Sequence, residues 1–403
     1  MAVSRAHAVY VIGQLGLTGA IFVFNVVVAR LLGPEQTGVW QTAVLVATYG
    51  TVLTLGTVNG MGREIPFHTG QKDLEARSES IATVARVLLL VSVLPAACAL
   101  TIGLSAAVPE WLLLGAALLV ARLFNTFSLM LLRSMQDYTR LGFHQGSTGA
   151  LLLVGLCWVW WQPTLGAVLG AMLIALMTVS GFAHPYLILK PASWSRFRAL
   201  VQIGLPIMLA GVLFGLLTSV DRFLILGLLG TEELGLYTPA IMALGVIVIA
   251  PSLISNIMYP RLAQEFGRTG SVECLIPMVN RLLWLNIGST WPVAAVLVVT
   301  FYLFVIPVIL PDYTEASVPM AIVFGSAIFL PVAQSFGDLF NVIGLQRRYL
   351  RNMAIGFVGN AVAGYFLAGP MGWGLEGVAV GTVIGTALFT LSQWLTYTAI
   401  RRT

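Results

Sequence analysis

Long apolar segments alternate with short polar stretches along the whole chain. A helix of about 20 apolar residues crosses the ~30 Å of hydrocarbon in a membrane. The polar stretches between the segments are too short to form a folded domain of their own. We therefore predict an all-α integral membrane protein with about 12 transmembrane helices. The predicted spans are 8–32, 39–61, 82–106, 110–132, 142–161, 164–187, 201–229, 236–259, 281–306, 316–343, 351–369 and 373–397.

The composition agrees with a membrane protein. Apolar residues make up 58% of the chain and charged residues only 9%, whereas about 25% of the residues in soluble domains are charged. The net charge of +5 resides in loops that would meet anionic lipids of the inner leaflet. Because the chain has no basic soluble module, we expect membrane lipids as partners and no nucleic acid.

Basic residues are concentrated on one side of the predicted membrane. With a cytoplasmic N-terminus, the loops on the cytoplasmic side carry almost all Lys and Arg residues, and the outer loops carry acidic residues only. This placement follows the positive-inside rule. We therefore predict cytoplasmic N- and C-termini and a multi-pass protein of the bacterial cytoplasmic (inner) membrane. The acidic residues of the outer face are Glu35, Glu110, Glu232, Glu233, Asp312, Glu315 and Glu376.

One polar segment between spans occurs twice. The run at 33–40, GPEQTGVW, recurs at 230–237 as GTEELGLY, at an offset of 230 − 33 = 197 residues. We predict two six-helix lobes, 1–189 and 201–403, joined by a cytoplasmic interfacial linker at 190–200. An even number of spans in each lobe gives a parallel repeat, which is typical of transporters with a substrate path between the halves.

Several motifs carry a resemblance to a known family. The run at 29–40, ARLLGPEQTGVW, resembles the end of the first span in bacterial polysaccharide-export flippases of the O-antigen type. These flippases belong to the multidrug/oligosaccharidyl-lipid/polysaccharide exporter (MOP) superfamily. Further matches, which extend the resemblance over nearly the whole chain, are 62–66 (GREIP), 221–225 (DRFLI), 235–237 (GLY) and 374–379 (GLEGVA).

The resemblance implies a mode of action and a cargo. It implies two six-helix lobes that move an undecaprenyl-pyrophosphate-linked oligosaccharide across the membrane by alternating access. Such transport belongs to polysaccharide biosynthesis, including that of the lipopolysaccharide O-antigen, and implies a polysaccharide polymerase machinery as a partner. The residues themselves do not indicate which glycan is carried.

Three arginines within or at the end of a span are candidates for binding the pyrophosphate. Arginine at the bilayer centre costs ~2.5–3.5 kcal/mol, and its guanidinium group matches phosphate oxygens bidentately. Arg122 lies near the middle of its span, with Asn125 one turn further on the same face. Arg222 lies inside the seventh span, and Arg30 lies closer to the outer surface, where it can also extend to water. A buried interhelix ion pair is the alternative for Arg122 and Arg222.

Amides inside spans are further candidates. The offset of the repeat relates Asn59 to Asn256, and Asn25 lies within the first span. We predict that Asn25, Asn59, Asn125 and Asn256 line a substrate cavity. Polar side chains also join transmembrane helices, at about 0.6 kcal/mol per hydrogen bond, and this remains the alternative.

Uphill or unidirectional transport would need an energy source, such as an ion gradient. The chain lacks the phosphate-binding loop of ATP-dependent proteins. Asp221 and Asp338 are the acidic residues that lie well inside spans, and Asp338 belongs to a polar stripe with Gln334 and Asn341. A desolvated carboxylate can exchange H⁺ or bind Na⁺, so we predict both as ion-coupling candidates. Substrate supply and product removal are the alternative driving force.

Other function classes fit the sequence less well. The four histidines are scattered without ligand spacing, and we expect no metal site, no cofactor and no enzymatic activity. A multidrug or cation antiporter of the same superfamily is the first alternative. A membrane glycosyltransferase, such as an O-antigen polymerase or ligase, is the second, although it would need a catalytic group of residues on a sizeable outer loop.

Overall fold

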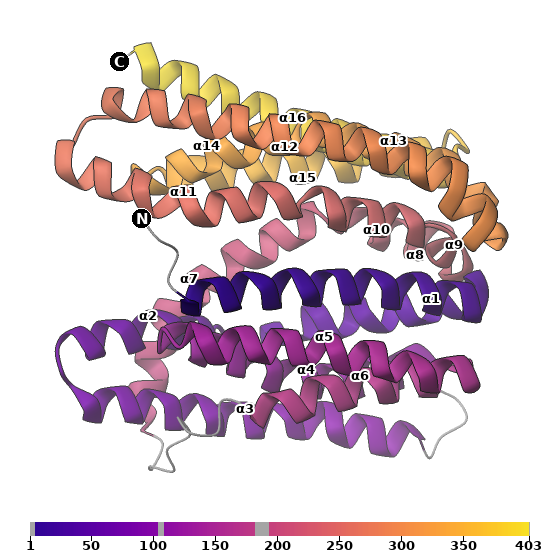
Figure 1. Ribbon diagram of the computed structural model, residues 1–403, viewed down its shortest axis with the longest axis horizontal. Helices are drawn as coiled ribbons and strands as arrows, with labels where there is room; N and C mark the ends of the chain where they lie inside the picture. The colour runs from indigo at the N-terminus through magenta and orange to yellow at the C-terminus, as the bar shows by residue number, and fades with distance from the viewer. Residues whose placement is uncertain (1–4, 104–108, 182–192, 403) are drawn as a thin grey trace. The chain divides into compact units, whose positions relative to one another are not determined.

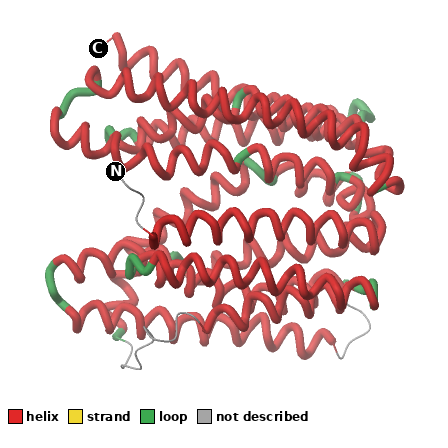
Figure 2. The backbone as a smooth tube through the Cα atoms, in the orientation of Figure 1, coloured by secondary structure: helices red, strands yellow, loops and turns green. Residues whose placement is uncertain are grey.

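The computed structural model describes residues 5–103, 109–181 and 193–402, and within them the chain is helical throughout, without strands (Figure 2). It divides into two compact units, residues 1–212 and 213–403, here called the N-terminal and the C-terminal unit. The division follows packing and falls inside the seventh span. The lobes predicted from the repeat, 1–189 and 201–403, remain a prediction.

Every predicted span is mainly helical where the chain is described, which confirms the all-α fold. Seven helical segments of the described residues are long and apolar enough to cross a membrane. Large apolar side chains such as Leu90 (73% exposed) and Trp161 (84%) point outward, as expected for a surface covered by lipid.

The N-terminal unit contains several long helices, and its α1 consists of two helices that meet at Gly33 (Figure 1). Its elements are α1 (Arg5–Gly50), a 3-10 turn (Thr51–Thr54), α2 (Thr57–Gly70), α3 (Leu74–Gly103), α4 (Glu110–Ser134), α5 (Tyr138–Trp161), α6 (Leu165–Ser180) and most of α7 (Trp194–Leu217). Local sequence signals set some of the ends. The Asp137 carboxylate caps α5 by accepting a hydrogen bond from the backbone N–H of Arg140 at 3.0 Å. The described part of the predicted linker, from residue 193 onward, leads directly into α7.

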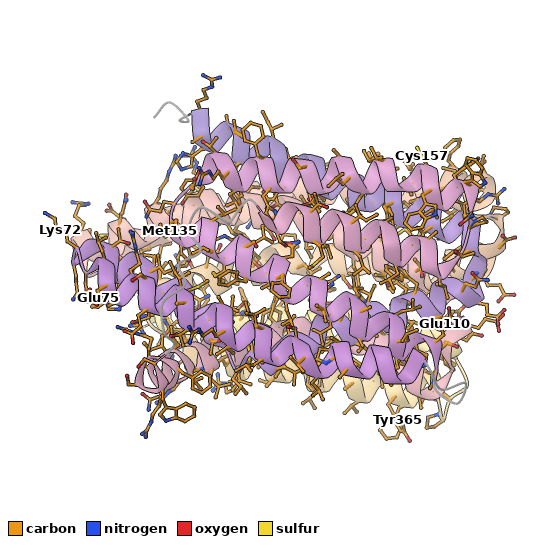
Figure 3. All side chains as sticks on the ribbon, turned by 90° about the horizontal axis from the view of Figure 1, so that it is seen from below. Lys72, Glu75, Glu110, Met135, Cys157 and Tyr365 are labelled. Carbon is orange, nitrogen blue, oxygen red and sulfur yellow. The ribbon has the colours of Figure 1, made fainter. Side chains whose placement is uncertain are left out.

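Helices α3, α4 and α5 of the N-terminal unit run in alternating directions. Figure 3 shows Lys72, Glu75 and Met135 toward one end of the unit, and Glu110 and Cys157 toward the other. The connections after α2 and α4 therefore lie at the same end. This is the arrangement that the alternation of basic and acidic loops predicts.

Two helices of this unit approach each other closely. In the first half of α1, Gly13 lies against Gly142 of α5, and a Cβ atom on Gly142 would come within 2.6–2.8 Å of the backbone of Val9 and Tyr10. Only glycine allows this contact, because any side chain would force the helices apart. Small residues are a common means of helix association in membranes, where lipid removes the hydrophobic driving force.

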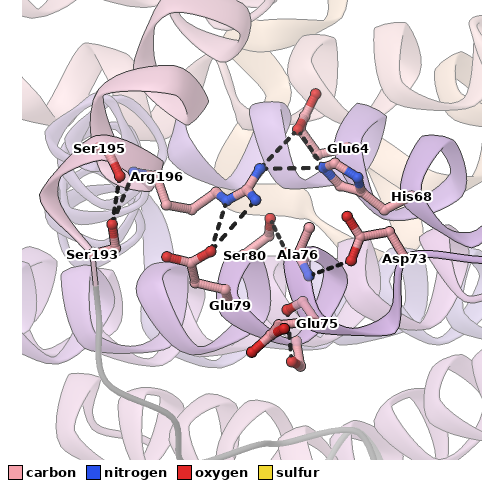
Figure 4. A network of polar contacts seen from close by, with 11 residues as sticks. Glu64, His68, Asp73, Glu75, Ala76, Glu79, Ser80, Ser193, Ser195 and Arg196 are labelled. Carbon is pink, nitrogen blue, oxygen red and sulfur yellow. Dashed lines mark hydrogen bonds and ion pairs between the residues drawn. The ribbon is translucent and has the colours of Figure 1, made fainter. Parts of the chain in front are cut away.

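An ion network joins the start of α7 to α2 and α3 (Figure 4). Arg196 lies 3.4 Å from Glu64 and 3.4 Å from Glu79, and its Nη1 is 3.2 Å from Nε2 of His68. Glu64 is also 2.9 Å from His68. These side chains are partly buried, so the network fixes the beginning of α7 against the rest of the N-terminal unit.

The C-terminal unit combines long helices with several interrupted spans. Its elements are α8 (Val220–Leu228), α9 (Thr231–Leu236), α10 (Thr238–Ile247), α11 (Ile249–Thr269), α12 (Ile276–Thr300), a π-helix (Phe301–Ile309), a 3-10 segment (Pro311–Ala316), α13 (Ser317–Phe324), a 3-10 turn (Gly325–Ile328), α14 (Leu330–Val342), α15 (Gln346–Ala368) and α16 (Gly374–Arg402). The seventh, eighth and tenth spans each consist of two helices joined near the middle. The interruptions lie at Ser219, Val248 and 325–329.

The repeated segment adopts the same backbone conformation in both units. Gly33 has φ 73° and ψ 175°, and Gly230 has φ 108° and ψ −176°. This region of backbone space is essentially restricted to glycine. The sequence repeat is therefore also a repeat of local structure, and in both units it ends one helix and starts the next.

Candidate functional site

A cavity of about 220 Å³ lies inside the C-terminal unit. Its wall includes residues next to all three interruptions, among them Thr218, Val248 and Leu330. Interrupted helices that surround a cavity are a feature of membrane transporters, because irregular backbone is tolerated at membrane depth only where protein or water covers it. This cavity is our candidate functional site. Its other lining residues are Phe214, Leu217, Arg222, Leu244, Gly245, Pro251, Ser252, Ala333, Gln334, Thr382, Thr386 and Phe389.

Arg222 supplies the charge of the cavity. It is the one charged residue among those described as lining it, and its half-buried side chain has no ion pair within the described residues. Its Nε is buried without a hydrogen-bond partner. The neighbouring Asp221 is 1% exposed and accepts a hydrogen bond from the backbone N–H of Arg222 at 2.8 Å. The guanidinium group is therefore available to an anion in the cavity.

The hydroxyl groups of the cavity are oriented to accept hydrogen bonds. Ser252 donates to the Val248 carbonyl at 2.7 Å, and Thr386 donates to the Thr382 carbonyl at 2.7 Å. Thr218 likewise donates to the Gly215 carbonyl at 3.0 Å. Because each hydroxyl uses its single proton on the backbone, only its lone pairs remain for a ligand. The cavity thus offers a cationic donor together with several neutral acceptors.

Gln334 connects the cavity to a buried carboxylate. Its Nε2 lies 3.4 Å from Oδ1 of Asp338, which is 6% exposed and lies one turn further on α14. Asp338 itself does not line the cavity. Each of the two predicted ion-coupling residues therefore contacts a residue that lines the cavity: Asp221 contacts Arg222, and Asp338 contacts Gln334. Asn341, the third member of the predicted stripe, is half-buried and lies outside the lining.

The predicted residues of the N-terminal unit are not gathered at one cavity. Arg122 is half-buried on α4, and its Nε has no hydrogen-bond partner among the described residues. Asn125 is buried with its Oδ1 also unpartnered. A small cavity of about 60 Å³ is lined by Asn59 and by Leu123 and Thr126 of α4, but not by Arg122 or Asn125.

Asn25 and Arg30 do not line either of these two cavities. Asn25 is half-buried on α1, and Arg30 is exposed near the end of the first span. Asn256 lies on α11, but its side chain is outside the described part of the structure. No cluster of three or more potential metal ligands occurs within the described residues.

The sequence did not single out several residues of the cavity. Thr382 and Thr386 lie one turn apart on α16 and face the cavity, and Phe214 and Phe389 form part of its apolar wall. The spacing of the two threonines in an otherwise apolar span was the available signal. It is weak, because threonine in a transmembrane helix commonly bonds to its own backbone.

Comparisons with known proteins identify a family and several relatives of the chain. Residues 4–266 match the profile of a family described as polysaccharide biosynthesis protein. Two curated relatives, each a probable multidrug resistance protein NorM from Xylella fastidiosa (strains 9a5c and Temecula1 / ATCC 700964), are 24% identical over 272 residues. The match covers 64% of this chain and 54% of each relative, so the chain spans about half the length of the curated relatives it matches.

Solved structures show the fold. A multidrug resistance MATE family transporter of the MOP superfamily, in an inward-facing conformation, has a TM-score of 0.73 at 17% identity, covering 99% of this chain and 100% of that chain. A MOP superfamily transporter from Pyrococcus furiosus Vc1 has a TM-score of 0.62 at 15% identity, covering 98% and 96%. The predicted membrane fold is confirmed, and the chain is a multi-pass protein of the bacterial inner membrane with the fold of the MOP superfamily.

Proposed function

The chain belongs to the polysaccharide biosynthesis protein family, and on this premise we propose that it transports a phosphate-bearing, lipid-linked oligosaccharide across the inner membrane. The fold supports transport, since it is that of MOP superfamily transporters. The cargo is inferred from the cavity. The observation that carries the proposal is Arg222 in the wall of the cavity, whose Nε has no hydrogen-bond partner among the described residues.

The chemistry of the cavity fits such a cargo. A pyrophosphate-linked sugar presents anionic oxygens and many hydroxyl donors. Arg222 can bind the phosphate oxygens, and the hydroxyls of Ser252 and Thr386 can accept hydrogen bonds from the sugar. At about 220 Å³, the cavity holds only a part of the oligosaccharide. We assign to it the phosphate and the adjoining sugar.

A multidrug or cation antiporter is the second candidate. It is favoured by the names of the relatives, since the curated ones are probable multidrug resistance proteins and solved ones include multidrug resistance transporters. The buried Asp338 and Asp221 would then carry H⁺ or Na⁺. Against an organic cation stands Arg222, whose charge would repel it. The Pyrococcus furiosus transporter is described as having a binding pocket of reverse polarity that suggests a different function, so pocket polarity is a meaningful variable in this fold.

Coupling to an ion gradient stays part of the proposal for either cargo. Both candidates contact a cavity-lining residue: Asp338 accepts a hydrogen bond from Gln334 at 3.4 Å, and Asp221 accepts one from the backbone N–H of Arg222 at 2.8 Å. The third possibility, a membrane glycosyltransferase, has no support from the named relatives.

Transport in reconstituted vesicles tests the proposal. We would measure translocation of a fluorescent undecaprenyl-pyrophosphate oligosaccharide by the wild type, Arg222→Gln and Arg222→Lys. Hydrogen bonds to a charged group contribute about 1.5–3 kcal/mol, so we expect Arg222→Gln to lower the rate by roughly 10- to 150-fold. The lysine variant should retain part of the rate, because it keeps the charge but loses the bidentate geometry.

The matched control is Arg268→Gln, which removes an exposed arginine of the same unit. Efflux of a cationic dye under a pH or Na⁺ gradient is measured in parallel, with Asp338→Asn. A wild type that moves no lipid-linked sugar but exports the dye, and loses dye export in Asp338→Asn, would establish the antiporter instead.

A further inference from the structure

A second recess of the C-terminal unit lies between α15 and α16, away from the cavity that Arg222 lines. It is a groove of about 420 Å³, with Arg348 and Arg351 on one wall and Ser392 and Thr396 on the other. Exposed apolar residues, Ile355 and Leu395, continue it along the two helices. The groove therefore combines a basic end with an apolar end.

The two ends lie at different depths of the predicted membrane. The eleventh span begins at residue 351, so Arg348 and Arg351 lie at the cytoplasmic boundary, at the level of the lipid headgroups. Ile355 is one turn further into the membrane on the same face of α15, and it is 42% exposed. Leu395, which is 54% exposed, lies just inside the predicted end of the twelfth span. The apolar end thus faces the acyl chains.

The positive charge of the groove is not neutralised by the protein. Other arginines of the predicted cytoplasmic side have carboxylate partners, such as Arg196 with Glu79 at 3.4 Å and Arg268 with Glu265 at 2.6 Å. Within the described residues, neither Arg348 nor Arg351 has such a partner, and no acidic residue lines the groove.

The floor of the groove is ordered by a buried hydrogen bond. Asn352, which is fully buried, donates from Nδ2 to Oγ1 of Thr396 at 3.0 Å and so links α15 to α16. Ser392 lies one turn from Thr396 on α16 and adds a hydroxyl to the same wall. This hydrogen bond fixes α15 and α16 relative to each other beneath the groove.

We propose that this groove is a binding site for an anionic phospholipid of the inner leaflet. Arg348 and Arg351 bind the phosphate of the headgroup, and an acyl chain lies along Ile355 and Leu395. Basic pockets between transmembrane helices on the cytoplasmic side are suited to anionic headgroups. Lipid binding at this groove does not depend on the transported cargo, because the groove and the cavity that Arg222 lines are formed by different residues.

Lipid binding to the purified, delipidated full chain tests this proposal. We would titrate phosphatidylglycerol, phosphatidylcholine and inorganic phosphate, and read binding by native mass spectrometry and by the shift in Tm. The variant is Arg348→Gln/Arg351→Gln. The matched control is Arg347→Gln, which removes an adjacent exposed arginine that does not line the groove. Each basic residue near an anionic lipid surface contributes about 1 kcal/mol, so the double variant should bind phosphatidylglycerol about 30-fold more weakly.

We expect phosphatidylglycerol to bind and to raise the Tm of the wild type and of Arg347→Gln, and phosphatidylcholine to do neither. Equal affinity of the double variant and the wild type would overturn the proposal. So would equal binding of the two lipids by the wild type, a comparison that does not depend on the folding of any variant. An equal rise in Tm with inorganic phosphate alone would reduce the site to a simple anion site and would also overturn it.

Discussion

The two units share a repeated segment but differ in how their interiors are filled. The N-terminal unit has one span interrupted at 51–56, an ion network around Arg196 and a described cavity of about 60 Å³. The C-terminal unit has interrupted helices around a cavity of about 220 Å³ that Arg222 lines. Duplication of a helical lobe therefore does not imply duplication of its site. On the proposed function, we infer that the C-terminal unit binds the cargo and that the N-terminal unit supports it.

The largest loss of stability is expected from a substitution at the close contact between α1 and α5 of the N-terminal unit. In Gly142→Leu, the new side chain would overlap the backbone of α1, and we expect a loss of stability of about 3 kcal/mol. The control is Gly16→Leu, where a Cβ atom meets nothing within 4 Å. Thermal unfolding of the purified proteins measures both. If the two variants have the same Tm, the close crossing of α1 and α5 is not a source of rigidity.

Substitution of Arg196, the central residue of the ion network, tests how much this network stabilises the N-terminal unit. Arg196→Gln deprives Glu64 and Glu79 of a charged partner in a partly buried setting, and we expect a loss of about 1.5–3 kcal/mol. In the C-terminal unit, Arg268→Gln removes one partner of an exposed pair, and we expect no measurable change. Equal Tm shifts for the two variants would contradict the difference between the units.

Substitution of Gly33 and of Gly230 should lower stability by similar amounts, because the two glycines share the same backbone conformation. Gly33→Ala and Gly230→Ala each force a Cβ atom into a backbone region that is essentially restricted to glycine, at a cost of about 1–3 kcal/mol. No atom lies close enough to either position to add a clash. Denaturation of the two variants side by side measures the cost. A large effect at only one position would show that the repeat is not structurally equivalent.

The smallest change in stability is expected at a pair of acidic residues, Glu232 and Glu233, that occurs only in the second copy of the repeated segment. Glu233 of the C-terminal unit corresponds to Gln36 of the N-terminal unit at the offset of 197 residues (36 + 197 = 233). Burial, Glu315 and Glu232 together raise the pKa of Glu233 above its ordinary value. Folding therefore favours the neutral carboxyl. This contribution to stability is fully present below the unfolded pKa and is lost as the pH rises through the raised pKa.

Glu233→Gln should accordingly stabilise the protein at neutral pH, by at most about 0.5 kcal/mol because solvent screens the site. The gain should vanish on acidification. Tm measured from pH 4 to pH 8 for the wild type and the variant checks this. Glu110→Gln, the same charge change in an exposed outer residue of the N-terminal unit, is the control. A gain that grows at low pH would contradict the direction of the shift.

Apolar periodicity predicted the helices well, because a span in lipid must be long and apolar whatever its neighbours are. It did not predict where the spans are interrupted. The break at Val248 lies within an apolar run, and nothing in that run distinguishes a continuous helix from two short ones. Such breaks depend on packing with distant segments, which one sequence does not contain.

The site was predicted in part, for a related reason. Depth in a span indicates which polar residues are costly, and by this criterion Arg122 was the first choice. Depth does not indicate which residues face the same space. The structure brings Arg222 and Gln334 together at the cavity with Thr382 and Thr386, which are separated from them by up to 164 residues of sequence (386 − 222 = 164). Whether Arg122 and Asn125 bind the cargo remains a prediction.

The conformation of Gly33 and Gly230 also affects how saturation mutagenesis of this chain should be interpreted. All nineteen alternatives to glycine carry a Cβ atom, so every missense change at these two positions should lower the yield of folded protein. Both positions would therefore score as intolerant, although a Cβ atom there would meet nothing within 4 Å. Intolerance at Gly33 or Gly230 would reflect backbone geometry alone, and it should not be counted as a sign of ligand contact.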